Sequence, residues 1–317
     1  MSAASREFGR EVGKEVELTA DWDLARIVAD LRTSRGKAHQ DRRRNGAIIE
    51  MPSRQALRDI LEGFFAVLFP THFGSPDLTE EGIDYFVGHK LDATLRMLVD
   101  QVNRELKFSS TMTDETRANQ SLDIAREFAS RLPRIRAVLE TDIQAAFQGD
   151  PAARSIEEVR FCYPGITGIA HHRLAHELYV LELPLLARII AELAHSATGI
   201  DIHPGAEIND SFFIDHGTGV VIGETTRIGR RVRLYQAVTL GAKRFPAGEN
   251  GGLIKGRLRH PIVEDDVVIY AGATILGRVT IGRGSTIGGN VWITHDVPPG
   301  TNVSQALARN FDDGAGS

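Results

Sequence analysis

The fold is decided by two segments: GIDIHPGAEINDSFFIDHGTGVVIGETTRIGRRVRLYQAVTLGAK at residues 199–243 and RHPIVEDDVVIYAGATILGRVTIGRGSTIGGNVWITHDVP at residues 259–298. In both, an aliphatic residue returns at every sixth position, which neither a single helix nor a single strand produces. A six-residue repeat is typical of a parallel β-helix, in which each unit forms a short strand and a turn. Three units close a triangular coil of about 18 residues, and stacked coils bury an apolar column. The inward positions are Ile202, Ile208 and Ile214, then Ile222, Ile228, Leu234 and Leu240, then Val263, Ile269, Ile275, Ile281, Ile287 and Ile293.

The part of the chain before the repeats is predicted to be helical. Its clearest helix is the stretch 53–69, where Ser53 can cap the first turn and apolar residues form one stripe. Pro184 should end or kink a helix in the apolar run 166–196. Other helices are expected at residues 20–31, 79–108, 114–129 and 132–147.

We therefore predict the fold class α+β, with an N-terminal all-α helical domain followed by a left-handed parallel β-helix of hexapeptide repeats. Two domains also agree with the length of 317 residues, which exceeds one typical domain. The predicted organisation is a polar tail at 1–17, the helical domain at 18–196, the β-helix at 197–305 with an extruded loop at 242–260, and a C-terminal tail at 306–317.

Composition and charge argue against several classes of protein. With 42% hydrophobic and 25% charged residues, the chain is predicted to be soluble and globular. The net charge of −5 predicts no nucleic-acid partner, and the short run Arg42-Arg43-Arg44 is expected to belong to a solvated tail. No stretch reaches the ~18 apolar residues of a membrane span. The only cysteine, Cys162, fits a cytoplasmic location and is expected to be a buried packing thiol rather than a nucleophile.

The six-residue register is interrupted twice, and each interruption carries a histidine. The step from Ile214 to Ile222 is eight, so two residues are added around His216. The step from Leu240 to Val263 is 23, which is three units plus five residues. That second stretch is rich in glycine and basic residues, so we expect it to leave the β-helix as a loop. Interruptions of a regular solenoid are common places for function.

His216 is the first candidate for chemistry, because it lies in the first interruption beside Asp215 and ahead of two glycines. A histidine oriented by a carboxylate suits removal of a proton from an alcohol. Asp201 precedes His216 by 15 residues, nearly one coil, so the two can lie on neighbouring coils of one face. The alternative is that His216 is only a hydrogen-bonded polar residue at a corner.

Arg259 and His260 form the second candidate, where the predicted loop rejoins the β-helix. A guanidinium can hold a small carboxylate through two hydrogen bonds; the alternative is a solvated loop end. His203 is expected to make a structural turn contact. The spacings among His203, His216 and His260 are 13 and 44 residues, so we predict no metal site. The remaining helical histidines are expected at a helix surface or interface: His171, His172, His176 and His195.

Small residues at 270–273 and 288–289 give coil walls against which a long, thin ligand could lie. Basic residues on the nearby loop suit a phosphorylated ligand. These basic residues are Lys243, Arg244, Lys255, Arg257 and Arg259.

The motifs DIHPGAEI, DHGTGVVIGET, LYQAVTLGAK, RHP and VIYAGATILGRVTIG resemble those of the serine O-acetyltransferases, and EVRFCYPGI…HRLAHELY resembles the bacterial subgroup with an extended helical domain. The resemblance covers residues 140–305. It implies acetyl transfer from acetyl-CoA to L-serine for cysteine synthesis, cysteine as feedback inhibitor, and a homo-oligomer, either a trimer or a dimer of trimers. The family's tail often ends in isoleucine, whereas this chain ends FDDGAGS, so no stable complex with O-acetylserine sulfhydrylase is expected.

The resemblance also assigns roles to residues. It implies that His216 is the catalytic base and Asp201 its partner. Asp150 and Asp215 would hold the serine ammonium, and Arg259 with His260 would hold its carboxylate. The acetyl-CoA wall would be formed by Ala242, Ala271, Gly272 and Gly289.

Two other functions remain open at this stage. The chain could be another coenzyme A-dependent acyltransferase of the hexapeptide superfamily, acting on a sugar or a different alcohol. It could also be a structural or regulatory solenoid without catalysis.

Overall fold

The computed structural model describes residues 22–38, 43–44, 47–48, 50–243, 253–254 and 256–305. The chain divides into two compact units, Met1–Ile49 and Glu50–Ser317. The first unit contains helix α1 (Leu24–Ala38) and two short antiparallel strands, β1 (Arg43–Arg44) and β2 (Ala47–Ile48). Neither strand was predicted.

Some predicted features lie outside the described residues. They are the tails at 1–17 and 306–317, Arg42 of the arginine run, and residues 244–252 and 255 of the expected loop. The domain boundaries given above stay predictions.

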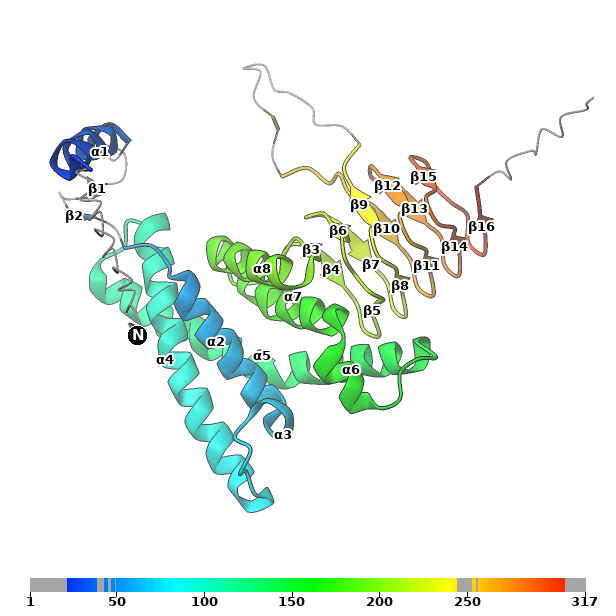
Figure 1. Cartoon of the computed structure of the whole chain (residues 1–317), viewed down its shortest axis with the longest axis horizontal. Helices are drawn as coiled ribbons and strands as arrows, with labels where there is room; N and C mark the ends of the chain where they lie inside the picture. Colours follow the sequence, from blue (N-terminus) through cyan, green and yellow to red (C-terminus); the bar gives the residue numbers. More distant parts are fainter. Residues whose placement is uncertain are drawn as a thin grey trace, which may run out of the picture. The chain divides into compact units, whose positions relative to one another are not determined.

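The second unit begins with helices and ends with the β-helix (Figure 1). Its helices are α2 (Arg54–Leu68), α3 (Pro70–Phe73), the short 3-10 helix η2 (Glu80–Gly82), α4 (Ile83–Ser109), α5 (Asp114–Gly149), α6 (Ile156–Cys162), α7 (Pro164–Val180) and α8 (Pro184–Thr198).

Helix α2 forms where the sequence predicts the clearest helix. The amide of Ala56 donates to the Ser53 hydroxyl at 3.2 Å, which caps the helix. Its apolar stripe is buried, and the Phe64 ring meets Phe128 of α5 with centroids 5.2 Å apart. The helix therefore forms where the capping residue and the apolar stripe both predict it.

Helix α5 differs from prediction because it is one helix, not two. It runs without interruption through Pro133, in the region where two helices were expected. Proline lacks the amide hydrogen that a helix interior uses. Leu132 and Ile135 on either side of it are buried, so packing stabilises the helix through this position.

Pro184 ends the helical run as predicted. Helix α7 stops at Val180, and Pro184 is the first residue of α8, where a missing amide hydrogen is not needed.

The prediction of a buried Cys162 is wrong, because this thiol is exposed. Cys162 is the last residue of α6, a short helix that was not predicted and that buries only Val159. The apolar neighbours of Cys162 in sequence therefore do not surround it in space.

The β-helix consists of three parallel sheets, as predicted. The first sheet has the order β15-β12-β9-β6-β3, the second β13-β10-β7-β4, and the third β16-β14-β11-β8-β5. The strands are β3 (Asp201–Ile202), β4 (Glu207–Ile208), β5 (Phe213–Ile214), β6 (Val221–Ile222), β7 (Arg227–Ile228), β8 (Arg233–Leu234), β9 (Thr239–Gly241), β10 (Ile262–Val263), β11 (Val268–Ile269), β12 (Thr274–Leu276), β13 (Thr280–Ile281), β14 (Thr286–Ile287), β15 (Trp292–Ile293) and β16 (Asn302–Val303).

The inward aliphatic residues stack on one another from coil to coil. Ile202 pairs with Ile222, and Ile222 with Leu240, along the first sheet. The first of these steps is 20 residues and the second 18, which confirms two added residues at the first interruption. These added residues form the corner between the third and first sheets, which we call the His216 corner.

The second interruption is longer than the sequence arithmetic suggested. Val263 pairs with Ile228 and Leu240 pairs with Ile275, so Leu240 and Val263 occupy successive sides of one coil. The step of 23 therefore contains one repeat unit and 17 extra residues, not three units plus five. Spacing alone could not show on which side the repeat resumes. This insertion leaves at the corner between the first and second sheets, which we call the His260 corner.

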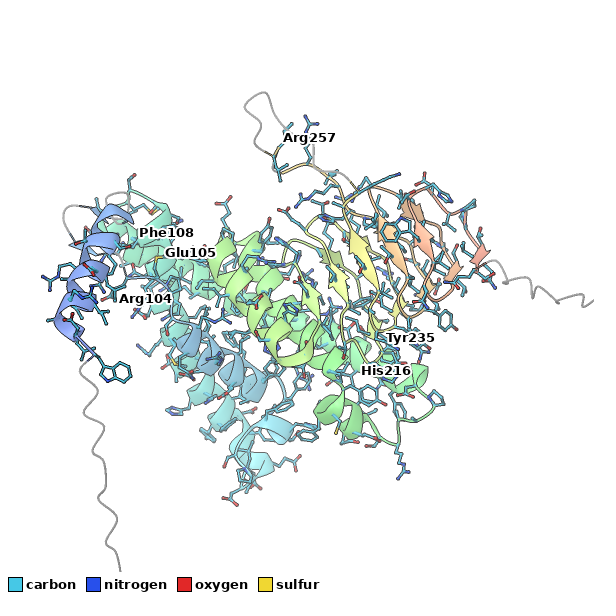
Figure 2. All side chains as sticks on the ribbon, turned by 45° about the horizontal axis from the view of Figure 1, so that its top comes forward. Arg104, Glu105, Phe108, His216, Tyr235 and Arg257 are labelled. Carbon is cyan, nitrogen blue, oxygen red and sulfur yellow. The ribbon has the colours of Figure 1, made fainter. Side chains whose placement is uncertain are left out.

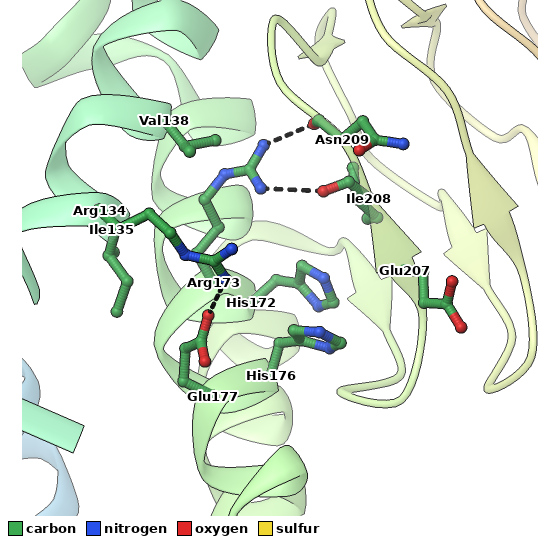
Figure 3. A pocket seen from close by; sticks show the side chains of 10 residues that line it. All are labelled: Arg134, Ile135, Val138, His172, Arg173, His176, Glu177, Glu207, Ile208 and Asn209. Carbon is green, nitrogen blue, oxygen red and sulfur yellow. Dashed lines mark hydrogen bonds and ion pairs between the residues drawn. The ribbon is translucent and has the colours of Figure 1, made fainter. Parts of the chain in front are cut away.

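A buried ion pair joins the helices to the β-helix. Arg173 of α7 donates to both carboxylate oxygens of Asp142 on α5, at 2.6 and 2.9 Å, and the Asp142 side chain is fully buried. The guanidinium also donates to the carbonyls of Ile208 and Asn209 (Figure 3). Asp142 in turn accepts the amide of Phe212 at 2.8 Å. The pair therefore ties α5 and α7 to the first coil.

A cavity of about 230 Å³ lies beside this ion pair, and Figure 3 shows the side chains that line it. His172 and His176 line it where α7 meets the β-helix, as expected of interface histidines, whereas His195 is exposed on α8. None of the predicted site residues is among those that line this cavity.

No helix in the described part of the chain is long and apolar enough to cross a membrane.

We expect Asp142→Asn to lower the free energy of unfolding by about 3 kcal/mol, because it leaves the buried Arg173 without its counter-charge. The matched control is Asp92→Asn, which removes a solvent-exposed Asp–Arg pair on α4 and should leave the free energy of unfolding nearly unchanged. Urea unfolding at fixed protein concentration measures both. Equal losses in the two variants would contradict the anchoring role of Asp142.

Candidate active site

The His216 corner presents its imidazole outward. His216 has a left-handed backbone, with φ of +57°, and its side chain is 71% exposed. Gly217 follows with φ of +82°, and a Cβ there would lie 2.4 Å from the Ile200 side chain. The tight packing of Gly217 against the preceding coil therefore turns His216 away from the core.

Two carboxylates lie near this imidazole. Asp215 Oδ1 is 3.6 Å from His216 Nδ1. Asp150 directly follows α5, and the Tyr163 hydroxyl donates to its Oδ2 at 2.5 Å. That hydrogen bond lowers the pKa of Asp150, to which the nearby charges of Arg233 and His216 also contribute. The end of α5 thus brings a carboxylate of the helical region to the corner of the β-helix.

Asp201 lies one coil away from His216. The amide of Gly219 donates to the carbonyl of Gly199 at 2.9 Å, so the corner that precedes Asp201 stacks on the corner that contains His216. Among the described residues, no hydrogen bond or ion pair joins Asp201 to His216. The partnership of these two residues stays a prediction.

The His260 corner contains the second candidate pair. Arg259 donates to Glu224 at 2.6 Å, and the Tyr179 hydroxyl donates to the same carboxylate at 3.2 Å. His260 is only 6% exposed, and its Nδ1 accepts the amide of Thr225 at 3.0 Å. Burial, and next the charge of Arg259, lower the pKa of His260 to about 4, so its imidazole is neutral near pH 7.

Glycine at position 223 makes room for this imidazole. A Cβ at Gly223 would lie 2.1 Å from His260 Cδ2, closer than any side chain could be accommodated. His203, at the same corner, accepts the amide of Gly205 at 3.0 Å, which confirms the expected turn contact.

One chain does not bring the two candidate groups together. His216 precedes strand β6, whereas Glu224 and Thr225 follow it. The two corners therefore lie at opposite ends of the strands of the first sheet. Asp150 and Asp215 lie at the His216 corner, and Arg259 and His260 lie at the His260 corner.

The predicted acetyl-CoA residues are divided between the same two corners. The amide of Gly272 donates to the carbonyl of Gln236, and Ala271 accepts the amide of Asn290, so these residues continue the column above His216. Gly272 has φ of +72°, and a Cβ at Gly289 would lie 3.1 Å from the Ala271 carbonyl oxygen. Ala242 instead follows β9 at the His260 corner.

Sequence reasoning missed the residues that support the candidates: Tyr163, Tyr179, Glu224, Thr225 and Arg233. Arg233 pairs with Asp215 across one coil, with NH2 to Oδ2 at 3.0 Å. Its guanidinium also lies 4.7 Å from the ring centroid of Tyr235, which is labelled on the β-helix in Figure 2. The strand register places Arg233 opposite Phe213, one coil of 20 residues earlier, and this step is the signal that could have brought Arg233 near Asp215. Tyr163 and Tyr179 lie on or beside helices, and no repeat spacing relates them to the β-helix.

Within the described ranges, no three histidine, cysteine or acidic side chains are grouped so that they could hold a metal ion.

Comparison with known proteins relates the chain to one family. A family model described as bacterial transferase hexapeptide (six repeats) matches residues 260–295. A Synechococcus elongatus protein, "Serine acetyltransferase, plasmid", is 54% identical over 308 residues, which cover 95% of this chain and 97% of that protein. Serine acetyltransferase of Bacillus subtilis is 48% identical over 166 residues, 52% of this chain and 72% of its own.

Solved structures agree with these relatives. Entamoeba histolytica serine acetyltransferase 1 in complex with L-cysteine has a TM-score of 0.69 and 33% identity, and covers 89% of this chain and 97% of its own. Neisseria gonorrhoeae serine acetyltransferase in complex with serine has a TM-score of 0.52 and 26% identity, and covers 80% of this chain and 96% of its own.

We expect the protein to lose stability as the pH falls from 6.5 towards 4, because the unfolded chain then binds protons that His260 does not bind in the fold. A histidine with a lowered pKa contributes a slope of up to about 1.4 kcal/mol per pH unit in this window, and nothing above it. His260→Gln should flatten the dependence, whereas His89→Gln on the exposed surface of α4 should keep it. Urea unfolding at pH 7.0, 6.0 and 5.0 measures the slopes. A His260→Gln slope equal to that of the unchanged protein would contradict a buried, neutral His260.

Proposed function

This chain belongs to the serine acetyltransferase family, and we propose that it transfers the acetyl group of acetyl-CoA to the hydroxyl of L-serine, giving O-acetylserine for cysteine synthesis. One observation supports placing the active site at the His216 corner: Asp150 and Asp215 both lie near the imidazole of His216. An outward imidazole beside two carboxylates fits an alcohol that carries an ammonium group.

His216 acts as the general base in this proposal. Its imidazole removes the proton of the serine hydroxyl as that oxygen attacks the thioester carbonyl. The carbon–sulfur bond then breaks, and coenzyme A leaves as the thiolate that takes up a proton. The exposed side chain of His216 can rotate towards Asp201 on the neighbouring coil, where the carboxylate would orient the ring.

The substrate's two charged groups fit the two corners. Asp150 and Asp215 supply negative charge for the ammonium. Arg259 supplies a guanidinium for the carboxylate, and the neutral His260 beside it a hydrogen bond. Glu224 holds Arg259 in place at 2.6 Å.

A trimer would join the two corners. Each subunit has the His216 corner at one end of the strands of its first sheet and the His260 corner at the other end. If that sheet faces a three-fold axis, the His216 corner of each subunit meets the His260 corner of the next, and the ring closes. The outward residues Val221 and Trp292 are 37% and 68% exposed and carry no charge, as a subunit contact favours. We therefore propose a trimer with shared sites as the minimal assembly. Two such trimers could join further.

Acetyl-CoA would lie along the column of small residues above His216. Ala271, Gly272 and Gly289 leave backbone groups open to a thin ligand, and Ala242 would contact it from the neighbouring subunit. Arg257, at the end of the described loop, adds positive charge for a phosphate (Figure 2). We propose that cysteine competes with serine for the same site, because the two amino acids differ only in sulfur for oxygen. We also propose that the protein works in the cytoplasm.

We expect release of free thiol from acetyl-CoA only when L-serine is present, with homoserine and galactosides at less than about 1% of that rate. His216→Ala should lower kcat by about 1,000-fold or more, because a positioned general base contributes 10²–10⁴-fold. His195→Ala, on the exposed surface of α8, is the control and should keep full activity. A disulfide-exchange dye follows the thiol. Near-normal turnover of His216→Ala would contradict the assignment of the base.

We expect two inactive variants to restore activity together if sites are shared. His216→Ala and Arg259→Ala should each be inactive alone. After unfolding and joint refolding at equal amounts, about one quarter of the sites in random trimers would hold both intact groups. Thiol release should therefore recover to about a quarter of the unchanged rate. No recovery, in mixed trimers shown by native mass spectrometry, would place each site within one subunit.

A further inference from the structure

Arg233 occupies an unusual position beside the proposed serine site. It is the first residue of β8, one coil beyond Asp215, and its side chain is 23% exposed. The guanidinium lies over the Phe213 ring at 4.9 Å and over the Tyr235 ring at 4.7 Å. Tyr235 is itself stacked on Tyr270, with ring centroids 4.9 Å apart and 13° between the planes. The cation is therefore in contact with the faces of two aromatic rings.

The polar contacts of Arg233 are few for a group so enclosed. It donates to Asp215 Oδ2 at 3.0 Å, while its Nε is buried with no hydrogen-bond partner among the described residues. A buried donor without a partner costs stability, and a buried ion pair seldom adds much. A contribution to folding stability therefore does not explain why an arginine occupies position 233.

The end of α5 closes the site around Arg233. A Cβ at Gly149 would lie 3.0 Å from the Phe213 ring and 3.6 Å from Arg233 NH1. The next residue is Asp150, whose carboxylate responds to the charges of both Arg233 and His216. Arg233 is thus close to both proposed ammonium ligands.

Carboxylates outnumber cations at this corner. The two proposed ammonium ligands, Asp150 and Asp215, contribute two negative charges, Asp201 on the preceding coil contributes a third, and Arg233 contributes one positive charge. The groups at this corner come from several elements: Asp215 from the corner itself, Asp201 from the preceding coil, Arg233 and Tyr235 from the next coil, and Asp150 with its partner Tyr163 from the end of α5 and the start of α7. Arg233 is the one permanent cation in this described group.

We propose that Arg233 is a positioning residue that holds Asp215 and offsets one negative charge of the serine site, so that His216 is free of its proton when serine binds. The inference rests on the proposed function and adds a residue to it. A base can accept the hydroxyl proton only if it is unprotonated. Two uncompensated carboxylates beside the imidazole would make it hold its proton more tightly.

The test is the pH dependence of kcat/KM for serine, measured by thiol release from pH 6.0 to 8.5. In Arg233→Gln the acid limb should move to higher pH by about 0.5 to 1 unit, since one nearby positive charge is lost. The rate at pH 6.5 should fall about three- to ten-fold, and the rate at pH 8.5 should approach that of the unchanged protein. In Arg233→Lys the acid limb should return most of the way to its position in the unchanged protein, because lysine keeps the positive charge.

Arg227→Gln is the matched control. Arg227 opens strand β7 as Arg233 opens β8, and it also pairs with a carboxylate one coil earlier, Glu207, but in an exposed position. Its pH profile should match that of the unchanged protein. An Arg233→Gln protein with an unmoved acid limb, or with the same fractional loss at every pH, would overturn the proposal.

Failure of this inference can be told apart from failure of the proposed function. If the unchanged protein does not acetylate serine, the function is wrong. If it does, and Asp215→Asn raises the KM for serine while Arg233→Gln leaves the profile unmoved, the function stands and the role of Arg233 is refuted.

Discussion

The geometry of the site depends on the buried ion pair between Asp142 and Arg173. Asp142 lies on α5 about two turns before Asp150, which directly follows that helix. By binding Arg173 and the amide of Phe212, it fixes that helix against the first coil. The end of α5 then arrives beside His216. In the proposed reaction the helical region therefore supplies one carboxylate, Asp150, at a corner of the β-helix.

The period of six could be predicted because it is a local property of the sequence. Every coil repeats the same requirement for an inward aliphatic residue, and Ile222 or Ile269 can be recognised without knowing what lies elsewhere. The length of the second insertion could not be predicted in this way. Only the pairing of Val263 with Ile228 shows on which side the strands resume.

The candidate site was predictable in part, for a related reason. His216 was visible because it breaks the register, and Asp150 came only from resemblance to a family, since its place depends on how α5 packs. Arg233 carries no motif, yet its pairing with Phe213 on the preceding coil brings it into an ion pair with Asp215. Glu224 likewise meets Arg259 only because the chain returns to the same corner after the insertion.

The 17-residue insertion has an evolutionary consequence. The strands on either side of it stack on the same neighbouring coils whatever its length, so residues can be gained or lost there without shifting the frame of the solenoid. Natural variation can therefore reshape the region around Arg257 and Arg259 while His216, at the opposite edge of the sheet, keeps its place. If the two corners form one pocket between subunits, as we propose, one half of that pocket can diversify while the other half is preserved.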